Sequence, residues 1–127
     1  MKAYWAHSKK IYGTPEEAEI LAVLEKVFDK VVCPNRDIGE KGDIQPYLDA
    51  IDNCDTVIVS EYQDHIGKGV YDEVLHAIDD TDLEVYVLRN WELVAIIRPA
   101  IVDPNDWAVD YGRLITNILE CLPKEAI

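Results

Sequence analysis

The sequence is poor in positive charge. It has 12 lysine and arginine residues against 25 aspartate and glutamate residues, which gives a formal net charge of −13. A chain this acidic repels a phosphate backbone at long range, so we expect no nucleic-acid partner. A small-molecule ligand, a salty cytoplasm and a basic protein partner are all compatible with the charge.

Long hydrophobic runs are also missing. Although 49% of the residues are hydrophobic, no run approaches the roughly 18 apolar residues of a membrane-spanning helix. The N-terminal segment MKAYWAHSKK follows a short apolar stretch with polar and charged residues, unlike a membrane span or a signal peptide. These absences predict a cytoplasmic protein without a membrane partner.

Cysteine is scarce and lies in no recognisable motif. Cys33, Cys54 and Cys121 are widely separated, and none belongs to a CxxC pair or to a Cys/His cluster with the spacing of metal ligands. We therefore expect reduced, buried thiols, and the sequence predicts neither a metal site nor a cofactor.

Internal repeats, low-complexity tracts and flexible linkers are absent as well. A chain of 127 residues has the size of one domain with a single core. We therefore expect residues 1–127 to form a single domain.

Short β-like runs alternate with helical patterns in the first 90 residues. The run 56–60 (TVIVS) is β-branched, as in a central parallel strand covered on both faces. Further strands are predicted at 2–6, 30–33 and 83–88, with helices at about 15–28, 44–53 and 69–78. Helices of this length between strands favour parallel pairing. The pattern predicts an α/β fold with a doubly wound, mostly parallel, Rossmann-like sheet of about four to five strands and helices on both faces.

The last third of the chain is less regular. The run Leu93–Ile97 is compatible with a further strand or with an edge hairpin. Apolar residues at helical spacing predict a closing helix from about Asn105 to Leu122, which Pro123 ends. The residues that would face the core are Trp107, Val109, Leu114, Ile115, Ile118 and Leu122.

The expected fold locates a candidate ligand site. In doubly wound sheets, ligands bind beyond the carboxyl ends of the strands, where the strand order reverses. The loops after the first and third strands are therefore the main candidates, above all the strand-to-helix turn Asp64–Glu73.

Glu73 is the principal candidate residue in that turn. Gly67 and Gly69 allow a ligand to approach the backbone, and the positive end of the following helix favours an ionised carboxylate in its first turns. An alternative interpretation is equally simple: the glycines are ordinary turn residues, and Glu73 is a common helix-start acid.

At this point the residues resemble a known family. The strand Asp55–Val59 and the segment Ile66–Ala77 (IGKGVYDEVLHA) resemble the nucleoside 2-deoxyribosyltransferase-like superfamily over about residues 1–90. The resemblance is strongest at Gly69, Glu73 and Ala77, whose spacing is similar to the family signature D-x-G-T-x-x-E-x-G-x-A.

The resemblance implies glycosyl transfer within a Rossmann-like fold. It implies cleavage or transfer of the N-glycosidic bond of a 2′-deoxynucleoside or its 5′-monophosphate, with Glu73 as the nucleophile at the anomeric carbon. A carboxylate suits that role, because it stabilises an oxocarbenium-like transition state and forms a glycosyl-enzyme intermediate. The resemblance also implies a homo-oligomer, since family members often complete each other's sites.

The resemblance further implies that the loop after the first strand contacts sugar, phosphate or base. Ser8 and Lys9 are good donors to a monophosphate, although such residues are often merely solvated. Tyr4 and Tyr12 are candidates for stacking on a base or bonding a sugar, and Tyr4 fits a core position equally well.

Both loops contain candidate proton donors to a departing base. His7 and His65 titrate in the useful range, although single loop histidines are often bystanders. The signature's aspartate is Gly67 here and its threonine is Val70, so Asp64 is the candidate for the missing acid. These departures keep open a second function, a non-catalytic nucleotide-binding module in the same crevice.

Overall fold

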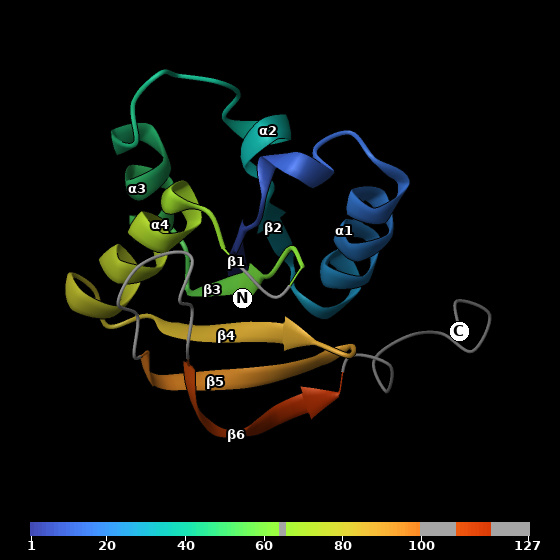
Figure 1. Ribbon diagram of the computed structural model, residues 1–127, viewed down its shortest axis with the longest axis vertical. Coiled ribbons are helices and arrows are strands. Elements are labelled where there is room, and N and C mark those ends of the chain that lie inside the picture. The colour runs from blue at the N-terminus through green and yellow to red at the C-terminus, as the bar shows by residue number, and fades with distance from the viewer. Residues whose placement is uncertain (64–65, 100–108, 118–127) are drawn as a thin grey trace.

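The computed structural model describes residues 1–63, 66–99 and 109–117. They form a six-stranded sheet in the order β2-β1-β3-β4-β5-β6 (Figure 1). The first four strands in this order are parallel to one another, and β5 and β6 are antiparallel to their neighbours. The strands are β1 (Lys2–Ala6), β2 (Lys30–Val32), β3 (Thr56–Ser60), β4 (Glu84–Arg89), β5 (Glu92–Pro99) and β6 (Val109–Asn117).

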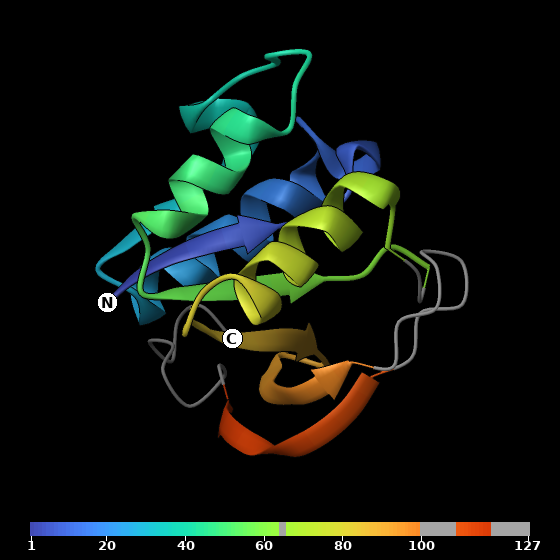
Figure 2. The ribbon, with the colours of Figure 1, turned by 90° about the vertical axis from the view of Figure 1, so that its left-hand side faces the viewer.

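Helices cover both faces of the sheet, which confirms the predicted α/β fold with a mostly parallel sheet. Figures 1 and 2 show α1 on one face and α3 and α4 together on the other. The helical elements are η1 (Lys9–Ile11, a 3₁₀ turn), α1 (Pro15–Val27), α2 (Pro34–Asp37), α3 (Gln45–Asp52) and α4 (Lys68–Asp79). Within the described ranges, no helix combines the length and the apolar character needed to cross a membrane.

The helix α1 begins where the sequence predicts. Thr14 is its N-cap, with the side-chain oxygen accepting from the backbone N–H of Glu17 at 3.3 Å, and Pro15 occupies the first helical position. The short helix α2 follows β2 after a single residue, Cys33. Pro34 at the first position of α2 explains that short helix, because its missing N–H needs no partner there.

The core has two halves, one on each face of the sheet, and β1 contributes to both. Tyr4 and Ala6 pack with α3 and α4, whereas Ala3 and Trp5 pack with α1. These four residues are all fully buried. The alternation follows from the strand geometry, which points successive side chains to opposite faces.

The last third of the chain forms the two antiparallel strands β5 and β6 at one edge of the sheet. The run Leu93–Ile97 lies in β5, which forms an antiparallel hairpin with β4. The predicted helix from Asn105 to Leu122 is wrong for Val109–Asn117, which form β6 against β5. Its apolar residues fit a helical stripe, but the segment also holds β-branched residues, which favour a strand, and a glycine, which disfavours a helix. Trp107, Ile118, Cys121 and Leu122 lie outside the described residues.

Candidate functional site

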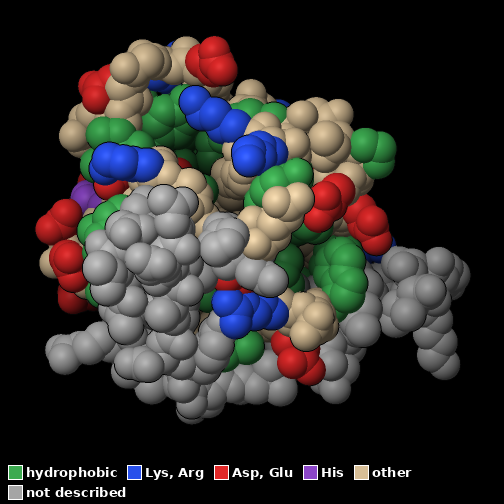
Figure 3. Space-filling view, in the orientation of Figure 1, with side chains coloured by type: hydrophobic (Ala, Val, Ile, Leu, Met, Phe, Trp, Pro, Cys, Tyr) green, Lys and Arg blue, Asp and Glu red, His purple; other side chains and the backbone are tan. Residues whose placement is uncertain are grey.

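A cavity of about 410 Å³ opens at the carboxyl ends of β1 and β3. The chain leaves β1 toward β2 on one side and continues from β3 toward β4 on the other, so the cavity lies where the strand order reverses. Figure 3 shows this face hollowed beneath the segment that joins α2 to α3, with hydrophobic side chains within the hollow and basic side chains beside it.

Three segments line the cavity. The stretch after β1 contributes Lys9 and Tyr12, and α4 contributes Gly69 and Glu73. The segment between α2 and α3, together with the first turn of α3, supplies Glu40, Lys41, Gly42, Asp43, Ile44 and Tyr47. Four of the residues predicted from the sequence, Lys9, Tyr12, Gly69 and Glu73, therefore share one cavity.

Glu73 is buried at the cavity wall with only 7% of its surface exposed. Its Oε2 atom has no hydrogen-bond partner among the described residues. Burial raises the pKa of the Glu73 carboxyl to about 7, the Tyr4 hydroxyl lowers it, and the negative charge of Asp72 raises it. At neutral pH the group is therefore close to half ionised.

This result corrects the expectation that the helix holds Glu73 ionised. α4 begins at Lys68, with Gly67 as its N-cap, so Glu73 lies beyond the first turn. The helix-dipole effect falls off within the first turn, whereas the desolvation of a buried carboxylate remains in full. The effect of burial on the pKa is therefore larger than that of the helix dipole, and the acid is partly protonated near pH 7.

Tyr4 and Tyr12 both lie close to the Glu73 carboxyl. Tyr4 is fully buried, and its hydroxyl, like Glu73 Oε2, has no partner in the described structure. Burial and the charge of Glu73 raise the pKa of the Tyr4 hydroxyl well above its usual range. The same two causes raise the pKa of Tyr12 to about 12. Both phenols therefore stay protonated and able to donate a hydrogen bond.

His7 and Ser8 do not line the cavity. The His7 ring stacks on Trp5 with centroids 3.6 Å apart, and both of its nitrogens have partners within the protein. Ser8 caps η1, where its hydroxyl accepts from the Lys10 backbone N–H at 3.1 Å. The structure thus places His7 in the core and Ser8 in a local turn.

The two glycines of α4 have different positions. Gly67 caps the helix with extended backbone, and Gly69 lies on the cavity wall. A Cβ atom at either position would meet no atom within 4 Å, and neither has a positive φ. Backbone conformation therefore does not require glycine at these positions. Asp64 and His65 lie outside the described residues.

The wall formed by the segment between α2 and α3 was not predicted from the sequence. Tyr47 projects from α3, and its hydroxyl donates to the Gly39 carbonyl oxygen, which ties α3 to that segment. Gly39 and Gly42 both have positive φ, which glycine adopts readily. These two glycines are the signal in the sequence for a sharply turning loop beside β1.

No family model, curated protein or solved structure matches the chain.

Proposed function

We propose that the protein cleaves or transfers the N-glycosidic bond of a 2′-deoxynucleoside or its 5′-monophosphate, with Glu73 as the nucleophile. One observation carries the proposal: a buried carboxyl with an unpartnered oxygen lies at the wall of a cavity where ligands of such sheets bind. An unpaired buried acid costs stability, and such groups concentrate at functional sites.

The cavity has the size and lining of a small-molecule site. A volume of about 410 Å³ falls in the range of known ligand pockets, roughly 300–1,000 Å³. The rings of Tyr12 and Tyr47 offer surfaces for a base or a sugar. The ammonium groups of Lys9 and Lys41 are available to a 5′-phosphate.

The proposed reaction proceeds in two displacements. A Glu73 oxygen bonds to the anomeric carbon while the bond to the base nitrogen breaks, and the base leaves with that electron pair and takes up a proton. Water or a second base then attacks the anomeric carbon and releases Glu73. The carboxylate also stabilises the positive charge that develops on the sugar in both steps. The protonated Tyr4 hydroxyl lies beside it.

The proposal also covers the class of the fold and the oligomeric state. The order β2-β1-β3-β4 is that of the doubly wound, Rossmann-like class to which the resemblance points. We infer a homo-oligomer on the same resemblance, which light scattering of the purified chain tests directly.

The reaction is tested by chromatography of free base. The purified protein is incubated with each 2′-deoxynucleoside and 5′-monophosphate, with and without a second base. We expect base release that Glu73→Gln and Glu73→Ala reduce at least 100-fold. Asp79→Asn is the matched control, because this acid lies in the same helix but is exposed and outside the cavity lining. If the wild type releases no more base than Glu73→Ala with any substrate, the glycosyl-transfer proposal is wrong.

A binding module is the second candidate, and the departures from the family signature at Gly67 and Val70 favour it. Titration calorimetry separates the two functions. A binder holds the nucleotide with saturable affinity, returns it intact, and keeps that affinity in Glu73→Gln.

A further inference from the structure

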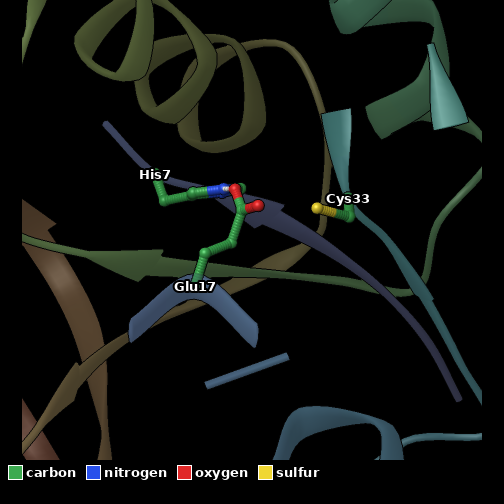
Figure 4. A group of neighbouring side chains, drawn as sticks. All are labelled: His7, Glu17 and Cys33. Atoms are coloured by element: carbon green, nitrogen blue, oxygen red, sulfur yellow. Dashed lines mark hydrogen bonds and ion pairs between the residues drawn. The ribbon is translucent and has the colours of Figure 1, made fainter. Parts of the chain in front are cut away.

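A second group of reactive side chains lies outside the cavity lining, beside the ring of Tyr12. His7 follows β1, Glu17 lies in the first turn of α1, and Cys33 follows β2. One ligand atom from each residue lies within 4.8 Å of the other two, and all three residues are buried. Figure 4 shows the His7 ring and the Glu17 carboxyl meeting, with the Cys33 sulfur beside them.

The contact between His7 and Glu17 is favourable only if a proton or a metal ion lies between them. His7 Nδ1 lies 2.9 Å from the Trp5 carbonyl oxygen, which can only accept a hydrogen bond, so Nδ1 carries the proton of the neutral ring. His7 Nε2 then presents a lone pair, yet it faces Glu17 Oε2 at 2.7 Å. Two acceptors at this distance repel unless a proton or a metal ion joins them.

The surroundings of the three residues are those of a metal centre. A metal-binding histidine typically donates its other N–H to a carbonyl or carboxylate, as His7 does to Trp5. Glu17 Oε1 is oriented by the Gly13 backbone N–H at 3.0 Å and by Asn35 Nδ2 at 3.1 Å, which leaves Oε2 free to bind. The Asn35 amide oxygen lies 3.1 Å from Cys33 Sγ, close enough to supply a fourth ligand.

We propose that His7 Nε2, Glu17 Oε2 and Cys33 Sγ form a binding site for one Zn²⁺ ion. Nitrogen, sulfur and carboxylate oxygen are the donors that this ion takes in proteins. Bond lengths of about 2.0–2.3 Å place neighbouring tetrahedral ligands roughly 3.3–3.6 Å apart. The His7 Nε2–Glu17 Oε2 distance of 2.7 Å would have to lengthen by less than about 1 Å to reach that spacing.

The metal would join three elements and support the cavity wall. It would tie the end of β1 to α1 and to the end of β2. The His7 ring meets Tyr12 edge-on with centroids 5.1 Å apart, and Tyr12 lines the cavity. The site is independent of the proposed glycosyl transfer, since none of its three ligands lines the cavity.

Binding would release a proton from the thiol. Zn²⁺ binds sulfur as the thiolate, so the proton of the Cys33 thiol must leave as the bond to sulfur forms. The apparent affinity for Zn²⁺ therefore rises with pH.

Metal titration of the full chain tests the proposal. After treatment with chelator, the protein is titrated with Zn²⁺ against a chromophoric competitor, and with Co²⁺ followed by absorption. We expect one ion per chain, a thiolate-to-cobalt charge-transfer band, and protection of one thiol from alkylation. Cys33→Ser and Glu17→Gln should each weaken binding at least 10-fold and remove the metal-dependent rise in Tm.

Cys54→Ser is the matched control, because Cys54 is also a free, buried thiol but packs on the opposite face of the sheet. It should bind Zn²⁺ as the wild type does. Circular dichroism identifies a variant that does not fold. In that case, alkylation of the wild type with and without Zn²⁺ still tests whether the ion protects a thiol. Absence of stoichiometric binding, a cobalt spectrum without the thiolate band, or equal loss in Cys54→Ser would show that a proton alone joins His7 to Glu17.

Discussion

At the scale of single residues, Glu73 combines a cost in stability with a candidate chemical role. Its carboxyl is buried beside the Tyr4 hydroxyl, and Glu73 Oε2 and Tyr4 Oη both lack partners in the described structure. The sequence indicated the residue through its spacing from Gly69, but not its protonation. Protonation depends on burial, which is a property of the packed fold and not of the local sequence.

The raised pKa of Glu73 makes stability depend on pH. An acid whose pKa rises on folding stabilises the native state fully below its ordinary pKa of 4.5, and this stabilisation is lost as the pH rises through about 7. The rise corresponds to about 3 kcal/mol. The free energy of unfolding of Glu73→Gln, relative to that of the wild type, should therefore rise by up to about 3 kcal/mol between about pH 5 and about pH 8. Urea unfolding of both proteins at the two pH values measures this difference. A difference between the two proteins that stays constant with pH would contradict the buried, unpartnered state.

The same pKa sets the direction of the pH profile for the proposed reaction. Attack on the anomeric carbon needs the ionised carboxylate, so kcat/KM should rise with pH and level off above about 7. Steady-state base release at a series of pH values measures the profile. A rate that falls through this range would show that Glu73 acts as an acid instead.

At the scale of elements, the β4–β5 hairpin has a two-residue, left-handed turn. Asn90 and Trp91 both have positive φ, 51° and 60° respectively, as a two-residue hairpin turn requires. Asparagine tolerates this conformation better than other residues with a Cβ atom, and glycine tolerates it best.

Substitution at Asn90 should therefore follow backbone preference. Asn90→Ala should lower the free energy of unfolding by about 1 kcal/mol, whereas Asn90→Gly should leave it unchanged or raise it slightly. Thermal or urea unfolding of the two variants measures the difference. Equal effects of the two substitutions would mean that this turn is not left-handed.

Elements in the first 90 residues could be predicted because two independent local signals agree there. Thr14 and Pro15 mark the start of α1, and the run 56–60 has the composition of a buried strand. β6 could not be predicted, because its apolar residues fit both periodicities and the choice depends on the free edge of β5. The cluster of His7, Glu17 and Cys33 has no local signal at all, since it forms only when β1, α1 and β2 pack together.

At the scale of the whole molecule, the net charge of −13 is the dominant property. Like charges on a compact surface repel one another, and dissolved salt screens that repulsion. Tm should therefore rise between roughly 0.05 M and 0.5 M salt, equally in NaCl and KCl, as differential scanning calorimetry would show. An unchanged Tm would mean that the charges are balanced locally by ion pairs such as Arg36 with Asp37.

The alternation of side chains along β1 makes this strand intolerant of insertion. Tyr4 points toward Glu73, and its neighbour Trp5 points toward His7 on the other face. One residue added ahead of Tyr4 would move every following side chain of the strand to the opposite face. The phenol would then occupy the place of the indole, so a single codon gained at this point would dismantle both proposed sites together.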